Sequence, residues 1–357
     1  YRLLAMPERA REGARLPTVR LADTRSEKVV DGLTESLAAA IAARLDRGEQ
    51  TLLFLNRRGY APVLVCNACG WTAGCQRCSA HLVVHLADRQ LRCHHCGHAE
   101  TIPRTCVQCG NVDLVPFGRG TQRLEAALAE RFPAARLLRV DSDSTRGKGR
   151  WEKMRGQINA GEADLLVGTQ IMAKGHDFPR LTLVGILHAD AALLAADYRA
   201  PERLFAQLYQ VAGRAGRAEI PGEVIVQTRY PGHPLYSALV AHDYGRFADA
   251  QLAEREQAGF PPFVYEAVLR AESDALDDAL GFLTRATASA PGDDVVTVYD
   301  PVPMSVVRIA GRERAHVLVQ SRSRRALQTF LREWMARLHE FKSNRVRWHI
   351  DVDPVEF

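Results

Sequence analysis

The sequence predicts an α/β protein in which a cysteine-rich insert interrupts an open parallel sheet and a separate α+β domain follows. Three observations support this prediction. Short apolar runs alternate with helical segments over most of the first 230 residues, as in proteins built from βαβ units. All eight cysteines lie within residues 66–109. The composition changes after PGHP (231–234), a turn-forming stretch that marks a domain boundary.

Hydrophobic periodicity places the elements of the first part in order. The expected helices cover residues 32–45, 121–132, a stretch near 150–160, and 202–217. The expected strands cover residues 51–56, 135–141, 163–169, 181–187 and 222–228. In the last part, a helix through 237–258 and a turn at FPPF (260–263) precede α+β alternation.

Four segments follow from this order. Residues 1–60 begin the α/β body, 61–115 form the insert, 116–230 complete the body and 231–357 form the C-terminal domain. The insert begins just after a predicted strand, where loops tolerate additional chain.

The eight cysteines form four Cys-x-x-Cys pairs. These pairs are Cys66/Cys69, Cys75/Cys78, Cys93/Cys96 and Cys106/Cys109. Two thiolates three residues apart can bind one metal ion from a tight turn, and two such turns complete a tetrahedral site. Glycine follows three of the pairs, at 70, 97 and 110, where the backbone must turn sharply. We expect two zinc ions rather than disulfides, since no secretory signal precedes such regular pairs.

The spacing also favours one way of matching the pairs. Between Cys78 and Cys93 lies HLVVHLADRQLR, which alternates like a β-hairpin. This favours Cys75/Cys78 with Cys93/Cys96 in one site and the outer pairs in the other. The histidines at 81, 85, 94, 95 and 98 are not needed as ligands, because eight thiolates satisfy two ions. Four thiolates leave no open position, so both sites are expected to be structural.

Charge and hydropathy exclude some classes of protein. The formal net charge is +5, but eight thiolates and two Zn²⁺ ions reduce it to about +1, so only local clusters are informative. No apolar run approaches the roughly 18 residues of a membrane span. The N-terminus lacks both a signal peptide and an initiator Met and reads as the middle of a domain. We expect a cytoplasmic protein of which this chain is a fragment.

Polar residues follow the strand predicted at 163–169. The stretch GTQIMAKGHDFP (168–179) places Thr169, Gln170, Lys174, Gly175 and Asp177 near the carboxyl edge of the sheet. Open α/β sheets bind ligands at that edge. An ordinary polar loop accounts for this stretch equally well.

QVAGRAGR (210–217) contains a more specific pattern. Gln210, Arg214 and Arg217 have i, i+4 and i+7 spacing, which predicts one helix face. Gly213 and Gly216 would let that face approach another surface closely. A solvated basic face has no need of two glycines within a helix.

These motifs carry a resemblance to a known family. FLNRRGY (54–60), GTQIMAKGHDFP and QVAGRAGR resemble the fourth, fifth and sixth motifs of superfamily-two helicases, which lie in the second, RecA-like motor lobe. The insert between the fourth and fifth motifs resembles the PriA family of bacterial replication-restart helicases (primosomal protein N′). NRRGYAPVLVCNACGW, RCHHCG, FGRGTQRLE, DYRAPERLFAQLYQVAGRAGR, FPPF and DVDP extend this resemblance over essentially the whole chain.

The resemblance implies a role for each motif. Arg214 and Arg217 would reach the γ-phosphate of ATP·Mg²⁺ across a cleft between two lobes, and Gln210 would line that cleft. Gly175 and Asp177 would couple the nucleotide state to the grip on DNA. The expected DNA contacts are Asn56, Arg57, Arg58, Thr169, Gln170 and Lys174. The family also implies the nested pairing of the cysteines.

One part of such a motor is missing from the sequence. A Walker A loop, G-x-x-x-x-G-K-[ST], does not occur, and RGKG (146–149) lacks its upstream glycine. We therefore expect ATP to bind only together with a first lobe upstream, and the chain alone not to hydrolyse ATP. The alternative is a motorless scaffold that organises DNA and partner proteins.

The C-terminal domain contains a basic stretch. Residues 308–347 have 11 basic against 3 acidic residues. The candidate contacts are Arg308, Arg312, Arg314, Arg322, Arg324 and Arg325. Such clustering suits phosphates or an acidic protein tail, although a solvated helix face is the alternative. The resemblance implies binding to fork and single-stranded DNA, single-strand-binding protein and helicase-loading proteins of the primosome. It also implies a monomer associated with the nucleoid.

Overall fold

The protein's structure is a computed structural model. It describes residues 16–55, 63–66, 68–77, 81–85, 89–93, 96, 98–117, 120–141, 144–145, 149–168, 178–193, 197–216, 221–341 and 345–355. The chain divides into two compact units. The first contains residues 1–60 and 119–251, and the second contains residues 61–118 and 252–357.

The first unit is built on a six-stranded sheet in which every pair is parallel. Its order is β1 (Thr18–Asp23), β13 (Glu223–Thr228), β12 (Leu181–Leu187), β4 (Gln50–Leu55), β11 (Leu165–Gly168) and β10 (Leu137–Val140). The central strands β4 and β12 are buried along their whole length, as expected for parallel strands covered on both faces. The predicted parallel sheet is confirmed. Strand β1 was not predicted, because at the sheet edge its exposed and buried residues alternate.

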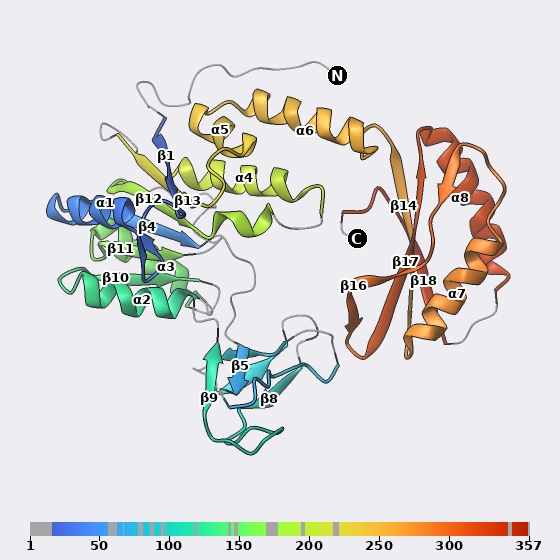
Figure 1. Cartoon of the computed structure of the whole chain (residues 1–357), viewed down its shortest axis with the longest axis horizontal. Helices are drawn as coiled ribbons and strands as arrows, with labels where there is room; N and C mark the ends of the chain where they lie inside the picture. Colours follow the sequence, from blue (N-terminus) through green and yellow to red (C-terminus); the bar gives the residue numbers. More distant parts are fainter. Residues whose placement is uncertain are drawn as a thin grey trace. The chain divides into compact units, whose positions relative to one another are not determined.

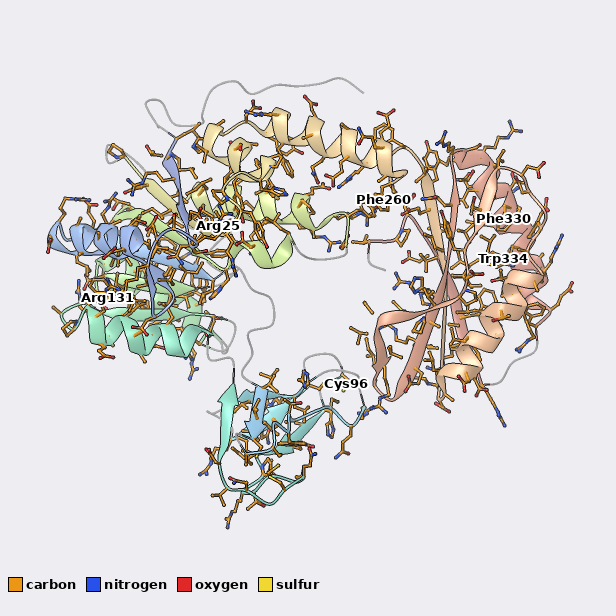
Figure 2. All side chains as sticks on the ribbon, in the orientation of Figure 1. Arg25, Cys96, Arg131, Phe260, Phe330 and Trp334 are labelled. Atoms are coloured by element: carbon orange, nitrogen blue, oxygen red, sulfur yellow. The ribbon has the colours of Figure 1, made fainter. Side chains whose placement is uncertain are left out.

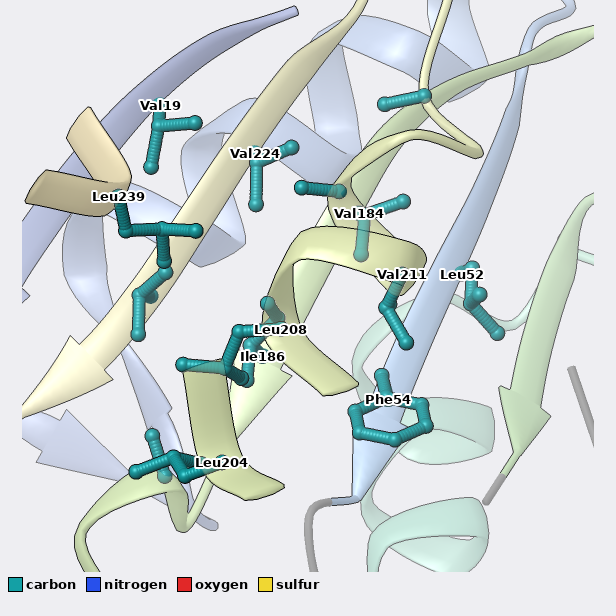
Figure 3. Close-up of a cluster of buried hydrophobic side chains, with 14 of the residues drawn as sticks. Val19, Leu52, Phe54, Val184, Ile186, Leu204, Leu208, Val211, Val224 and Leu239 are labelled. Carbon is teal, nitrogen blue, oxygen red and sulfur yellow. The ribbon is translucent and has the colours of Figure 1, made fainter. Parts of the chain in front are cut away.

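Helices cover both faces of this sheet (Figure 1). They are α1 (Glu35–Asp46), α2 (Gly120–Arg131), α3 (Arg150–Ala160), α4 (Ala200–Ala212), α5 (Pro234–Ala241) and the 3-10 helix η2 (Ala189–Ala192). Helix α6 (Tyr244–Ala258) follows α5, and its Phe247 stacks on Phe205 of α4. Strand β4 alternates between two cores: Leu52 and Phe54 pack with α4 and α5, and Leu53 and Leu55 with α1 and α2. Figure 3 shows Phe54 near Val211 of α4 in the first of these cores.

Two predicted helices differ from those in the structure. The helix predicted over 202–217 ends at Ala212, and Gly213 is its C-cap, so the predicted single helix face carrying both arginines is wrong. The helix predicted over 237–258 is two helices. His242 has a left-handed φ of 53° after α5, and the side chain of Asp243 accepts a hydrogen bond from the N–H of Arg246 at 2.9 Å. Such a side chain satisfies an orphan donor where a new helix begins.

The C-terminal domain is an antiparallel sheet with two helices, so the α+β prediction is confirmed. Its strands are β14 (Tyr265–Ser273), β15 (Val296–Val298), β16 (Val302–Ile309), β17 (Arg312–Ser321) and β18 (Arg347–Val352). Helices α7 (Leu276–Ala288) and α8 (Arg324–His339) pack on one face of the sheet. Phe330 and Trp334 of α8 belong to that core (Figure 2), and the Trp334 indole N–H donates to the carbonyl of Ala286 at 2.9 Å.

The insert contains a small antiparallel sheet of its own. The order is β8 (Ala99–Thr101), β7 (Gln90–Arg92), β6 (Val83–His85), β5 (Val63–Cys66) and β9 (Leu114–Phe117). Strands β6 and β7 pair with Val83 opposite Arg92, which confirms the predicted hairpin. A separate two-stranded ribbon joins β2 (Val29–Val30) to β3 (Leu33–Thr34). Within the described part of the chain, every helix is too short or too polar to cross a bilayer.

Candidate metal centres and arginine loop

The outer cysteine pairs come together in one cluster. The sulfur atoms of Cys66, Cys69, Cys106 and Cys109 all lie within 4.8 Å of one another. Cys66 and Cys109 are 3.7 Å apart, as are Cys69 and Cys106. A tetrahedral zinc site with Zn–S bonds of about 2.3 Å requires sulfurs about 3.8 Å apart. The four residues therefore fit a zinc ion as they stand.

Two backbone turns with the same geometry build this cluster. The N–H of Cys66 donates to the carbonyl of Trp71 at 2.8 Å, and the N–H of Gly70 donates to the carbonyl of Cys66 at 2.9 Å. In the second turn the N–H of Cys106 donates to the carbonyl of Asn111 at 2.7 Å. Gly70 and Gly110 have left-handed φ values of 74° and 75°. Glycine is favoured there because it has no Cβ to clash.

The inner pairs form a second cluster. The sulfurs of Cys75, Cys93 and Cys96 lie within 4.8 Å of one another, and those of Cys75 and Cys96 are 3.8 Å apart. Cys78, the expected fourth ligand, lies outside the described residues. Two residues after Cys75, the N–H of Arg77 donates to the sulfur of Cys75 at 3.4 Å. The described sulfurs thus fall into the two groups that the nested pairing requires.

The described histidines lie outside both clusters. His81 and His98 belong to neither, and the ring of His98 is 3.5 Å from the carboxylate of Glu100. The side chain of His85 and the whole of His94 and His95 lie outside the described residues. The two clusters are compatible with two zinc ions, and four thiols are present in the outer one.

The thiols of the outer cluster differ in acidity. Burial opposes ionisation of Cys106, but backbone N–H groups of Cys109 and Gln108 lower its pKa to about 7. At Cys69 the backbone N–H of Trp71 favours the thiolate, yet burial and the thiols of Cys109 and Cys106 raise the pKa to about 12. Crowded thiols ionise one after another at increasing cost, and a bound cation offsets that cost. Zinc would hold all four as thiolates and release their protons.

The arginine loop, residues 213–216, follows α4 and is held by its backbone. The N–H of Gly216 donates to the carbonyl of Leu181, at the start of β12, at 2.9 Å. A Cβ on Gly216 would lie 2.0 Å from the nitrogen of Gly222, and Gly216 has a φ of +66°. A Cβ on Gly222 would lie 2.2 Å from the carbonyl carbon of Ala215. Two backbone segments therefore cross in direct contact, which only glycine permits at both positions.

This crossing fixes where the loop leaves the sheet. Leu181 and Gly222 stand at the amino ends of β12 and β13, whereas Gly168 ends β11 at the carboxyl edge. Since these strands are parallel, β11 ends at one edge of the sheet and β12 begins at the opposite edge. Gln210 is exposed in the last turn of α4, and Arg214 is half-buried in the loop.

The other predicted motor residues lie outside the described residues. They are Asn56, Arg57, Arg58, Thr169, Gln170, Lys174, Gly175, Asp177 and Arg217. Their contacts with nucleotide and DNA stay predictions.

The six C-terminal arginines do not form one group. Arg308, Arg312 and Arg314 lie on β16 and β17, and Arg322, Arg324 and Arg325 lie at the other end of β17 and the start of α8. Arg312 and Arg314 instead share a cavity of about 610 Å³ with Arg270, Arg347 and His349. Sequence reasoning missed Arg270 and His349, although charged residues alternate with apolar ones on β14 and β18.

Comparison with known proteins places these regions in one family. Three family models match: the helicase conserved C-terminal domain at 109–219, the PriA DNA helicase Cys-rich region domain at 75–100, and the primosomal protein N C-terminal domain at 256–355. The parallel sheet of the first unit thus resembles a RecA-like helicase lobe.

Curated relatives match over nearly the whole chain. The replication restart protein PriA of Haemophilus influenzae is 43% identical over 93% of this chain and 46% of its own length. That of Bacillus subtilis is 34% identical over 99% of this chain and 45% of its own length. The chain therefore spans about half the length of these relatives.

Among solved structures, the helicase domain of Pyrococcus furiosus Hef is 15% identical over 54% of this chain and 24% of its own, with a TM-score of 0.27. A TM-score this low carries no weight here. The family models and the curated relatives agree: the chain belongs to the PriA family of replication restart proteins and matches its C-terminal domains.

Proposed function

We propose that the chain is the second motor lobe, zinc module and C-terminal domain of a 3′-to-5′ DNA helicase that reloads replication at stalled forks. In this proposal Arg214 and Arg217 reach the γ-phosphate of an ATP·Mg²⁺ bound to a first lobe. Positive charge fixed at that point stabilises the transition state of phosphoryl transfer.

The observation that carries the proposal is the backbone crossing at Gly216 and Gly222. A Cβ at either glycine would lie within 2.2 Å of the opposite backbone, so the loop cannot move without breaking this contact. Catalytic groups must be held in place by rigid surroundings to be effective. A solvated basic loop has no need of such a constraint.

The remaining roles complete this proposal. Thr169, Gln170, Lys174, Asn56, Arg57 and Arg58 contact the DNA strand, while Gly175 and Asp177 couple the nucleotide state to that grip. The topology supports this division, because β11 ends at one edge of the parallel sheet and β12 begins at the other. Single-strand-binding protein and helicase-loading proteins of the primosome are the proposed protein partners, in the nucleoid.

The test uses the full-length protein that contains this chain. Replacing Arg217 with Ala should lower DNA-stimulated ATP hydrolysis at least 10³-fold, the scale typical of an arginine finger, and leave DNA affinity unchanged. Arg229→Ala is the matched control, because Arg229 lies just after β13, away from the loop. ATP hydrolysis that survives in Arg217→Ala would contradict the assigned role.

A second candidate is a motorless scaffold that holds fork DNA and partner proteins. It is favoured by the self-contained cysteine clusters, which need no nucleotide. Under this alternative, Arg214 and Arg217 are dispensable and the same Arg217→Ala protein restarts replication normally. The two candidates therefore differ in a single experiment.

A further inference from the structure

The hairpin of strands β16 and β17 in the C-terminal domain ends in a tight turn. Ile309 lies opposite Arg312 across the two strands, so only Ala310 and Gly311 form the loop. Both loop residues have left-handed φ values, of 52° and 84°, which is the pattern of a type I′ turn. Such a turn matches the twist of the flanking strands, so the hairpin remains regular up to its tip.

This tip contacts the cysteine-rich insert, which belongs to the same compact unit as the C-terminal domain. The N–H of Gly311 donates to the carbonyl of Arg77 at 2.6 Å. The side chain of Ile309 packs against the buried core of the insert, and that core contains Cys75 and Cys93 of the inner cluster. The tip therefore contacts the insert beside the inner cluster, through both a hydrogen bond and an apolar side chain.

Arg77 connects the hairpin to a sulfur atom of the inner cluster. It stands between Cys75 and Cys78 in the inner Cys-x-x-Cys turn. Its N–H donates to the sulfur of Cys75 at 3.4 Å, and its carbonyl accepts the hydrogen bond from Gly311. A hydrogen bond to an ionised acceptor is stronger than one to a neutral acceptor, and a cysteine must be ionised to bind zinc. Metal binding at Cys75 should therefore hold Arg77, and with it the acceptor for Gly311, in place.

The outer cluster provides a contrast. In its second turn the N–H of Gln108 donates to the sulfur of Cys106, also at 3.4 Å. This turn faces solvent, because Gln108 is exposed and Val107 is 70% exposed. The same local geometry thus occurs in one turn that contacts the hairpin tip and in another that is open to solvent.

The hairpin tip also forms part of a cavity in the C-terminal domain. Ile309 and Ala310 line the cavity of about 610 Å³ together with Met304. One short segment of chain therefore contacts the inner cysteine turn and shapes the wall of this cavity. A movement of the tip would change both.

We infer that the hairpin tip, residues 309–312, is a docking element for the inner cysteine turn, so that metal binding at the inner cluster and docking of the tip stabilise each other. Loss of the inner ion releases the tip and loosens the cavity wall, whereas loss of the outer ion leaves both in place. Coupling between two sites is reciprocal, so loosening the tip must also weaken metal binding at the inner cluster. The inference goes beyond the proposed function, because it needs neither ATP nor DNA.

The first test changes the metal sites and follows the hairpin, in the zinc-loaded full-length protein that contains this chain. Cys93→Ser removes a ligand of the inner cluster, and Cys69→Ser, the matched control, removes one of the outer cluster. Hydrogen exchange is resolved to single amides. The N–H of Gly311 should exchange at least about fivefold faster in Cys93→Ser, which is the lower end of typical coupling between sites. It should exchange at the unaltered rate in Cys69→Ser.

The second test changes the hairpin and follows the metal. Ile309→Ala removes part of the apolar contact with the insert, and Val302→Ala is its control, because Val302 is 45% exposed on the same strand. After equilibration with graded chelator, a short pulse of iodoacetamide marks each cysteine that has lost its metal ion, and mass spectrometry identifies it. Ile309→Ala should lower the chelator concentration that makes Cys93 reactive about fivefold and leave that for Cys66 unchanged. Val302→Ala should change neither.

Folding of the C-terminal domain is checked in the same proteins. Ile309 lies outside the core that α7 and α8 form, so amides of these helices should exchange at the unaltered rate in both hairpin variants. Faster exchange there would mean that Ile309 supports the domain itself, which contradicts the inference.

Other results would also overturn it. The N–H of Gly311 could stay protected in Cys93→Ser, or lose protection equally in Cys69→Ser. Ile309→Ala could weaken metal binding at both clusters alike, which would indicate a general effect on the insert. Since neither test measures ATP hydrolysis, these outcomes are separate from that of the full-length Arg217→Ala protein.

Discussion

The cysteine insert and the arginine surfaces differ in how complete their sites are. In the outer cluster, Cys66, Cys69, Cys106 and Cys109 bring all four ligands of one ion within 4.8 Å. Arg214, by contrast, lies in a loop held rigidly by Gly216 and Gly222, in a chain without a Walker A loop.

This difference indicates a separate role for each region. A closed site contributes to folding, because the metal ion binds the folded chain, whereas the unfolded chain has no assembled site for it. An open site holds charged side chains where an external anion can reach them, and this lowers the stability of the folded chain. Metal removal should therefore affect structure, while changes at the arginines should affect binding and turnover. The following predictions test this division.

Removing zinc should have the largest effect. A strong chelator should release close to two zinc ions per chain and unfold the insert, since structural zinc sites contribute about 10–16 kcal/mol of apparent binding free energy at pH 7. Metal release is measured with a colorimetric indicator, and unfolding by hydrogen exchange in residues 63–117. Release of a single ion would contradict two four-cysteine sites.

A matched pair of variants sharpens this result. Cys69→Ser removes one ligand of the outer cluster, and Val107→Ser alters an exposed residue of the same turn. The first should retain about one zinc ion and the second both. Hydrogen exchange in the parallel sheet of the first unit should stay unchanged in both variants.

Adding one methyl group at the backbone crossing should have an effect nearly as large as that of removing zinc. Gly216→Ala places a Cβ 2.0 Å from the nitrogen of Gly222 and puts alanine at a φ of +66°. Overpacking and the left-handed conformation together should cost about 3 kcal/mol of unfolding free energy. Gly232→Ala meets nothing within 4 Å and should cost less than about 0.5 kcal/mol. Denaturant unfolding of both variants measures the difference, and equal midpoints would mean that the crossing is not tight.

Much of the fold could be predicted because its signals are local. The strand 181–187 was predicted to the residue, since LTLVGIL is apolar apart from Thr182 and buried throughout. Strand β1 was not predicted, because an edge strand such as TVRLAD has no continuous apolar run. The end of α4 was not predicted. The heptad-like spacing of Gln210, Arg214 and Arg217 suggested that the helix continues, but Gly213 caps it.

The candidate sites also differ in whether their sequence signals are local. Cys-x-x-Cys spacing identified the ligands, because the two sulfurs of a pair are placed by a single turn. The cavity beside Arg314 and Arg347 depends instead on register among three strands, where Glu272 lies opposite both arginines. Those residues are 42 and 75 positions from Glu272, and spacing along the chain carries no information about such pairing.

The smallest predicted effect concerns the pH dependence of stability at the half-buried His316. His316 has a pKa below its ordinary value of about 6.5, because of burial and the nearby charges of Arg270 and Arg314. Above about pH 6.5 the imidazole is neutral in both folded and unfolded chains, so it has no effect on stability. As the pH falls from 6.5 toward the lowered folded pKa, the unfolded chain binds the proton first, and stability should decrease.

NMR titration of the imidazole measures this pKa directly, with His316→Gln to assign the signal. His349→Gln, which replaces an exposed histidine, should keep the pH-dependent loss that His316→Gln removes. If His316→Gln lost as much stability below pH 6.5 as the unaltered chain, the burial of this imidazole and its arginine neighbours would not account for the pH dependence.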